Sequence, residues 1–131
     1  MRPAEIAAVF VTRINDHDLG GLIELMTDDH VFMDALANRV AGRDAMRSGW
    51  EEYFALVPDY WITVERTLQN DRFAALFGTA GGTYAGGSGG QTGRWEAPAA
   101  WLAETRDGQV AMWRVYADNL PIRRLMGVER P

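Results

Sequence analysis

The main change in the spacing of apolar residues along the chain comes at Pro58, and this change restricts the fold more than any other feature. Before Pro58 the apolar residues recur every three or four positions, which predicts helices. After it they alternate with polar residues, which predicts strands. Proline cannot continue a helix, so the helical part of the chain is expected to end there. Helices followed by a run of strands are typical of an α+β fold.

The expected elements follow from this pattern and from the turn residues between them. They are a helix from Pro3 to Ile14, a helix from Leu19 that ends near Asp28, a short strand at 30–34, a helix from Gly42 or Asp44 to Val57, four strands at 61–68, 72–84, 95–104 and 110–118, and a helical tail at 122–126. A length of 131 residues suits one core. The sequence therefore predicts a single α+β domain over residues 1–131, in which three N-terminal helices pack on one face of a curved antiparallel sheet.

Several kinds of catalytic chemistry are excluded because the residues that perform them are missing. The chain has no cysteine and its 13 basic residues are all arginine, so it has neither a thiolate nucleophile nor a lysine for a Schiff base. Neither serine lies in a nucleophile-elbow motif, and two histidines are too few for a three-histidine zinc site. The remaining carboxylates, tyrosines and arginines suit proton transfer. We expect no metal, no cofactor, and no thiol or serine chemistry.

Charge and hydropathy restrict the partners of the chain and its location. The formal net charge of −5 argues against binding to nucleic acid, which needs a basic surface. No apolar run reaches the ~20 residues of a membrane helix, and the first residues do not resemble a secretory signal. With no cysteine to form disulfides, the sequence predicts a cytoplasmic protein that binds neither membrane nor nucleic acid.

Glycine is concentrated in one part of the strand region, where eight of the 14 glycines fall between Gly78 and Gly93. A glycine-rich loop can bind phosphate, but this stretch lacks the third glycine of a dinucleotide motif and no helix follows it. We therefore expect a hairpin connection, with a sharp bend in the preceding strand at residues 78–82.

Two stretches carry a resemblance to a known family. One is Leu19-Gly-Gly-Leu-Ile-Glu-Leu-Met-Thr-Asp-Asp-His-Val-Phe-Met-Asp34, and the other is Gly108-Gln-Val-Ala-Met-Trp-Arg-Val-Tyr-Ala-Asp118-Asn-Leu-Pro-Ile-Arg-Arg-Leu-Met-Gly127. With the order of elements, they make the chain similar to the nuclear transport factor 2-like superfamily, in its SnoaL-like branch of polyketide cyclases and relatives of ketosteroid isomerase. The resemblance implies a cone-shaped fold with a deep apolar pocket, and it leaves the reaction open because this fold hosts many functions.

Large aromatic side chains are the candidates to line such a pocket and to bind a small hydrophobic molecule. The candidate ligand-binding residues are Phe10, Trp50, Tyr53, Phe54, Trp101, Trp113 and Tyr116. The alternative for each of them is that it only fills the core.

Asp34 is the first candidate catalytic residue, because it matches the position of the proton-transferring carboxylate in ketosteroid isomerases. A carboxylate on an apolar wall is a stronger base than one in water, which suits removal of a proton from carbon. The chain departs from those isomerases at the oxyanion-hole positions, where it has Phe10 and either Ala100 or Trp101. Steroid isomerisation is therefore not expected. Asp34 could instead be a solvated acid or the ion-pair partner of a neighbouring arginine.

Asp118 is the second candidate, because it matches the acid–base aspartate of SnoaL-like cyclases, which close a ring by aldol chemistry without metal or cofactor. Strict alternation puts Asp118 on the opposite face of the last strand from Trp113, so it can face the pocket only if that strand bulges or ends before it. The alternative role is a cap for the helical tail.

Limonene epoxide hydrolases have a similar fold and activate water with an Asp-Arg-Asp set. Their strand reads Trp-Arg-Asp where this chain has Trp113-Arg114-Val115, and the upstream Arg-x-Asp is missing as well. An epoxide hydrolase is therefore not expected.

Two functions remain. The first is a cofactor-independent enzyme of the cyclase or isomerase type that acts on a small hydrophobic carbonyl compound, with Asp118 or Asp34 as acid–base and a tyrosine orienting the substrate. The second is a module without catalytic activity that binds a hydrophobic ligand or dimerises. A homodimer is expected in either case, because apolar residues on the sheet, Trp61, Phe77 and Trp95, offer area for a two-fold interface.

Overall fold

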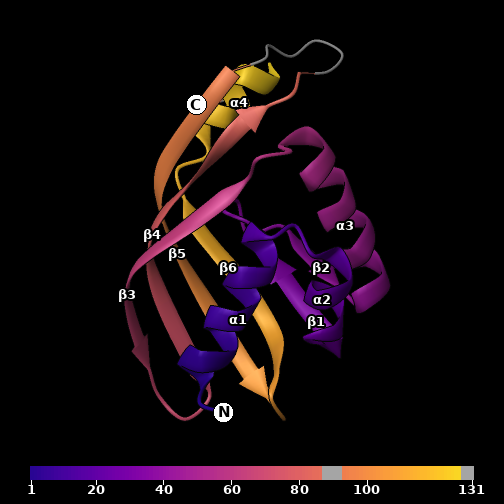
Figure 1. Cartoon of the computed structure of the whole chain (residues 1–131), viewed down its shortest axis with the longest axis vertical. Helices are drawn as coiled ribbons and strands as arrows, with labels where there is room; N and C mark the ends of the chain where they lie inside the picture. Colours follow the sequence, from indigo (N-terminus) through magenta and orange to yellow (C-terminus); the bar gives the residue numbers. More distant parts are fainter. Residues whose placement is uncertain (87–92, 128–131) are drawn as a thin grey trace.

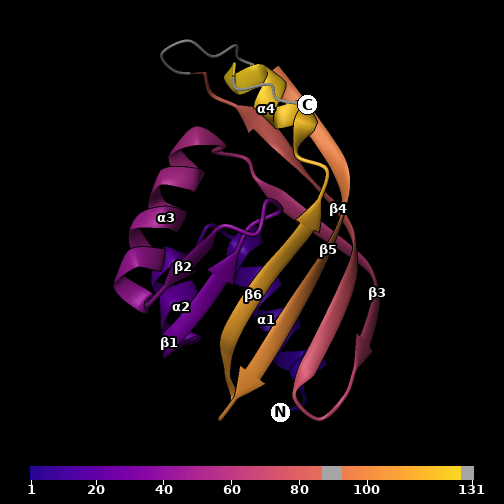
Figure 2. The same ribbon diagram turned by 180° about the vertical axis from the view of Figure 1, so that it is seen from behind.

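The computed structural model describes residues 1–86 and 93–127 and has a six-stranded sheet in the order β2-β1-β6-β5-β4-β3. The elements are α1 (Pro3–Asn15), α2 (Leu19–Glu24), β1 (Met26–Met33), β2 (Arg39–Ala41), α3 (Arg43–Leu56), β3 (Trp61–Gln69), β4 (Phe73–Tyr84), β5 (Gly93–Arg106), β6 (Gln109–Ala117) and α4 (Leu120–Met126). The sheet curves around α1, and α3 lies beside its open end (Figures 1 and 2). The expected α+β fold with helices on one face of a curved sheet is confirmed.

The start of β1 differs from the sequence-based expectation. The prediction that the second helix extends to Asp28 is wrong, because α2 ends at Glu24 and residues 26–33 form β1. Two of the six residues of α2 are glycines, which disfavour a longer helix. β1 also pairs in parallel with β6, a strand distant in the sequence, and so the sheet is mixed rather than purely antiparallel.

α1 packs against part of the concave face of the sheet. Its buried residues recur at helical spacing, and they are Pro3, Ile6, Ala7, Phe10, Val11 and Ile14. At its C-terminal end, the Asn15 side chain donates to the Ile62 carbonyl oxygen (2.9 Å) and accepts from the Ile62 amide (2.8 Å). This pair of hydrogen bonds attaches the helix to β3, the strand at the edge of the sheet.

An irregularity lies beside residues 78–82, where a sharp bend of the strand was expected, but it is on the neighbouring strand β3. The register shifts between Val64 and Arg66, next to the partner of Val64, Gly78. Such a bulge increases the local twist and curls the sheet. The expected hairpin connection lies between the paired ends Tyr84 and Gly93, and its residues 87–92 fall outside the described residues.

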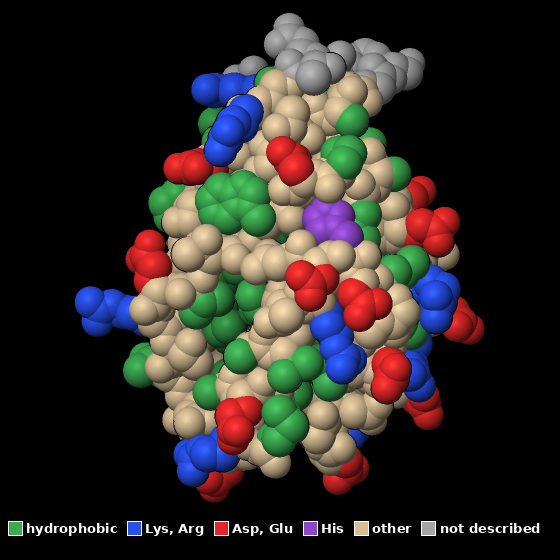
Figure 3. Space-filling model, in the orientation of Figure 1, with side chains coloured by type: hydrophobic (Ala, Val, Ile, Leu, Met, Phe, Trp, Pro, Cys, Tyr) green, Lys and Arg blue, Asp and Glu red, His purple; other side chains and the backbone are tan. Residues whose placement is uncertain are grey.

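The surface carries no dominant charge on the face shown in Figure 3, where the described acidic and basic side chains are interspersed. No helix among the described residues is long and apolar enough to span a membrane.

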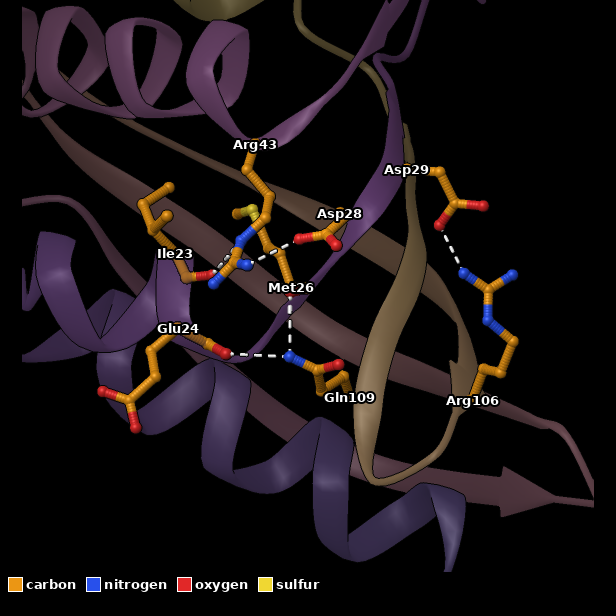
Figure 4. A network of polar contacts seen from close by, with 8 residues as sticks. All are labelled: Ile23, Glu24, Met26, Asp28, Asp29, Arg43, Arg106 and Gln109. Atoms are coloured by element: carbon orange, nitrogen blue, oxygen red, sulfur yellow. Dashed lines mark hydrogen bonds and ion pairs between the residues drawn. The ribbon is translucent and has the colours of Figure 1, made fainter.

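The junction of β1 and β6 is irregular, and polar contacts hold it together (Figure 4). The register shifts between Met26 and Val31, and Gln109 Nε2 donates to the carbonyl oxygens of Glu24 and Met26, both at 3.1 Å. Arg43 binds the Asp28 carboxylate (2.8 Å) and the Ile23 carbonyl oxygen (3.2 Å), and Arg106 pairs with Asp29. These contacts fix the start of α3 against β1, and α3 forms one wall of the cavity described below.

His30 sits inside this irregular junction. It is completely buried. Its Nδ1 lies 2.7 Å from the Val110 carbonyl oxygen, which can only accept, so Nδ1 carries the proton. Burial lowers the pKa of His30 below its ordinary value of 6.5, because a buried imidazolium loses hydration. His30 is therefore a neutral core residue that satisfies a carbonyl at the bulge.

His30 makes stability depend on pH. Since its pKa is lower in the folded state, the unfolded chain takes up the proton first, and stability is lost as the pH falls below 6.5. The free energy of unfolding is expected to fall by at most about 1.4 kcal/mol per pH unit through this one group. Urea unfolding followed from neutral to mildly acidic pH, above the range in which ordinary carboxylates titrate, measures it. His30→Asn keeps a donor for Val110 without titrating, and its profile should be flatter; parallel profiles would contradict this assignment.

Candidate functional site

A cavity of about 850 Å³ opens between the concave face of the sheet, α3 and α4. Its wall combines large aromatic side chains with small alanines, and the volume that larger side chains would fill at the alanine positions stays open. Its lining residues on the sheet alternate along β5, where Trp95, Ala97, Ala99 and Trp101 all face inward. A cavity of this size accommodates a ligand of several rings.

Tryptophans form most of the aromatic wall. Four of the five tryptophans of the chain line the cavity, and they are Trp50, Trp95, Trp101 and Trp113. Trp101 and Trp113 stack with ring centroids 6.4 Å apart, and the indole N–H groups of Trp50, Trp95 and Trp101 are buried without a hydrogen-bond partner among the described residues. The wall is thus suited to flat, apolar ligands.

The sequence-predicted ligand-binding residues fall into two groups. Trp50, Tyr53, Trp101 and Trp113 line the cavity, whereas Phe10, Phe54 and Tyr116 do not. Phe10 is completely buried beneath the cavity, with its ring centroid 4.7 Å from that of Trp113. Phe54 stacks on His17, with the ring centroids 4.3 Å apart. Tyr116 is 47% exposed on the outer face of the sheet, where Arg114 lies over its ring. The prediction that Tyr116 lies in the pocket is therefore wrong, because it alternates with Val115 and Ala117, which face inward.

Two tyrosines supply neutral hydroxyl groups to the cavity. Tyr53 comes from α3 and Tyr60 from the segment before β3, and their rings meet edge to face at 4.9 Å. Burial raises the pKa of both hydroxyls far above the usual value of 10, so both remain protonated at physiological pH. Protonated phenols can donate a hydrogen bond to a ligand carbonyl.

Asp34 lies at the cavity mouth just after β1, but its carboxylate is occupied by its own loop. Oδ1 accepts from the amides of Leu36 and Asn38, both at 2.9 Å, and Oδ2 accepts from Asn38 Nδ2 at 3.0 Å. The ion pair with a neighbouring arginine that was one alternative is absent among the described residues. Asp34 therefore stabilises the turn between β1 and β2.

Asp118 also lies at the mouth, because β6 ends at Ala117 and the chain turns there into α4. This is the condition under which alternation allows it to face the pocket. Oδ1 accepts from the Leu120 amide (3.0 Å), whereas no hydrogen bond reaches Oδ2 from the described part of the chain. Asp118 is therefore not the N-cap of α4, which is Asn119; it stabilises the turn into the helix and keeps one carboxylate oxygen available.

Arg123 is the one cationic side chain among the described residues that line the cavity. It lies on α4, and its Nη1 is 3.4 Å from the Asn119 side-chain oxygen. Asn119 follows Asp118 directly, so the guanidinium and the Asp118 carboxylate belong to the same rim of the mouth.

The lining residues that were missed in the sequence include Trp95, Tyr60 and Arg123. Trp95 shares the two-residue spacing of Trp101 and could have been placed on the same face. It was instead expected at a dimer interface, which is incompatible with its position in the cavity. Tyr60 and Arg123 lie outside the strands, in segments where no periodic pattern indicates which way a side chain points.

Metal chemistry has no evident donor set in this site. Among residues 1–86 and 93–127, no group of three histidine, aspartate or glutamate side chains is arranged to hold a metal ion. The lining carboxylates are Asp34, Glu52 and Asp118, all at the mouth.

Comparison with known proteins agrees with this geometry. Residues 7–113 match the family model of the SnoaL-like domain, and no curated protein matches the chain. A protein with a ketosteroid isomerase-like fold from Catenulispora acidiphila, crystallised with trimethylamine, is similar with a TM-score of 0.81 at 17% identity, covering 98% of this chain and 95% of that one.

Two further solved structures have the same fold. A proposed SnoaL-like polyketide cyclase from Shewanella denitrificans gives a TM-score of 0.83 at 12% identity, covering 94% and 95% of the two chains. An epoxide hydrolase from M. tuberculosis gives 0.76 at 15% identity, covering 93% and 86%. At these identities the structures establish the fold alone, while the match of the family model over most of the chain shows that this protein belongs to the SnoaL-like domain family.

Proposed function

We propose that the protein is a cofactor-independent acid–base enzyme of the cyclase or isomerase type that acts on an apolar carbonyl compound. The observation that carries this proposal is a cavity of about 850 Å³, walled by aromatic side chains, with a carboxylate oxygen of Asp118 available at its mouth. Apolar walls bind the body of such a ligand, and a carboxylate next to them is suited to take a proton from carbon.

Asp118 and the two cavity tyrosines then have distinct roles in proton transfer. Asp118 Oδ2 removes a proton from the carbon beside the carbonyl group, and the electrons of that C–H bond move to form an enolate. The same carboxylic acid returns the proton at another carbon in an isomerisation. In a ring closure the enolate carbon attacks a second carbonyl group, whose oxygen becomes an alkoxide and takes the proton back from the carboxylic acid. Tyr53 or Tyr60 orients the carbonyl group by donating a hydrogen bond.

Exchange of hydrogen for deuterium tests the proposal without knowledge of the natural substrate. Bicyclic ketones such as 1-tetralone are incubated with the protein in D₂O, and loss of the signal of the protons beside the carbonyl is followed by NMR. Ala99→Phe is the matched control, because the side chain at 99 faces the cavity and a phenyl ring would fill it. We expect exchange above buffer for the native protein and none above buffer for the filled variant, with unchanged circular dichroism.

A ligand-binding module without catalysis is the second candidate. It is favoured by one observation, that Asp34 and Asp118 both cap local turns and so have a structural role already. Binding of the same ketones, seen as quenching of tryptophan fluorescence, without exchange above buffer would support this function and overturn the enzymatic one.

A homodimer through the outer face of the sheet is proposed as well. Phe77, Ala100 and Tyr116 are neighbours across β4, β5 and β6, and Phe77 and Tyr116 are 42% and 47% exposed. A row of apolar side chains across an open sheet is a self-complementary surface for a two-fold contact. Light scattering at micromolar concentration should give twice the monomer mass, and Phe77→Glu should give the monomer. A native chain that is monomeric would contradict the proposal.

A further inference from the structure

Arg123 has no carboxylate partner among the described residues. Arg43, Arg72 and Arg106 each pair with a carboxylate, whereas no carboxylate among the described residues lies within 4.0 Å of Arg123, Asp118 included. Its side chain contacts a neutral oxygen instead, Asn119 Oδ1, at 3.4 Å. A half-buried guanidinium on a cavity wall without a counter-charge is an unused donor of charge-assisted hydrogen bonds.

The helix that carries Arg123 is held firmly in place. Ile122 is buried, and Leu125 packs on Gly93 at the start of β5, where a Cβ would come within 2.7 Å of its side chain. Gly127 ends the helix in the left-handed conformation, which glycine adopts without strain. The guanidinium is therefore positioned at the mouth by the packing of α4 rather than by an ion pair.

The other charged groups of the lining are carboxylates, which accept hydrogen bonds and cannot stabilise a negative oxygen on a ligand. Both oxygens of Asp34 are hydrogen-bonded within its own turn, and Glu52 and Asp118 are exposed to solvent, which screens them. Of the positions that would form an oxyanion hole by resemblance to ketosteroid isomerases, Phe10 is a buried phenyl ring below the cavity and offers no donor, and Trp101 offers only a neutral indole N–H. The described lining therefore has one cationic donor that can meet a negative oxygen.

We infer that Arg123 binds the carbonyl oxygen of the ligand and stabilises the negative charge that develops on it when Asp118 removes the proton. This inference rests on the proposed function. Proton removal leaves the charge mainly on an oxygen two bonds away from the carbon that lost the proton, so the base and the cation must sit apart and act on different atoms. Asp118 and Arg123 on one rim, with no ion pair between them, meet this requirement.

A pair of coumarins distinguishes this role from a structural one. The anion of 7-hydroxycoumarin is a flat, apolar ring system with a delocalised negative oxygen, like an enolate, and 7-methoxycoumarin has nearly the same shape without the charge. Quenching of tryptophan fluorescence reports binding, because four of the five tryptophans line the cavity, and absorbance reports the ionised fraction of the bound probe.

The expected results concern three variants. Arg123→Gln should weaken binding of the hydroxycoumarin anion about tenfold relative to the native chain and leave binding of the methoxy compound unchanged. Arg123→Lys should restore part of the loss. Arg124→Gln, which removes the same charge from the same helix outside the lining, should behave like the native chain.

The outcomes separate the two proposals. Equal ionisation of the bound probe in the native chain and in Arg123→Gln would overturn the role of Arg123 and leave the proposed function intact. Failure of the native chain to bind either coumarin would count against the cavity as a ligand site, and therefore against the proposed function and this inference together.

Discussion

Asp118→Asn is expected to lower the rate of deuterium exchange beside the ligand carbonyl by roughly 10²–10⁴-fold, the usual contribution of a positioned general base. The substitution separates catalysis from stability. The amide oxygen of the new side chain can still accept from the Leu120 amide, as Asp118 Oδ1 does at 3.0 Å, so the turn into α4 keeps its hydrogen bond. The loss should therefore appear in the exchange rate and not in the free energy of unfolding, which urea denaturation measures.

Asp34→Asn is the matched comparison, because it removes the same charge from the same cavity mouth. Both oxygens of Asp34 are already engaged by Leu36 and Asn38, so its removal should leave the exchange rate close to native. It should instead cost about 1 kcal/mol of stability through the weakened turn. Loss of exchange in Asp34→Asn with native exchange in Asp118→Asn would show that Asp34, and not Asp118, is the base.

The position of Asp118 shows what a sequence can predict about such a site. Alternation along β6 requires the strand to end before Asp118 if that residue is to face the cavity, and β6 does end at Ala117. The same alternation excludes Tyr116 from the cavity, and applying it along β5 would have included Trp95. Alternation therefore indicates on which face of the sheet a side chain lies, as long as the strand is regular.

Other features could not be predicted because they depend on contacts distant in sequence. The parallel pairing of β1 with β6 joins Phe32 to Trp113, and no local pattern near residue 26 indicates it. The burial of His30 follows from that pairing, since its ring bonds the Val110 carbonyl oxygen at the bulge. Arg123 reaches the cavity only because α4 folds back on β5, which is a matter of tertiary packing.

Gly78→Ala is expected to destabilise the fold by at least about 3 kcal/mol, because the added methyl group has no room. A Cβ at Gly78 would overlap the carbonyl oxygen of Thr63 on β3 and lie 2.8 Å from its carbon. Both atoms belong to backbone that is paired in the sheet, so neither can move without breaking the register between Val64 and Arg66. The cost falls on the bend that curls the sheet around the cavity, and equilibrium urea unfolding measures it.

Gly20→Ala is the control that separates the clash from the general effect of replacing glycine. Gly20 lies in α2, where an added methyl group would meet open space within 4 Å, so alanine there should stabilise the chain by roughly 0.5–1 kcal/mol. The two identical substitutions are thus expected to act in opposite directions. A loss of less than about 1 kcal/mol for Gly78→Ala would mean that β3 and β4 can separate locally at little cost. Glycine at this position would then not be what fixes the curvature of the sheet, and the shape of the cavity would depend on the bulge alone.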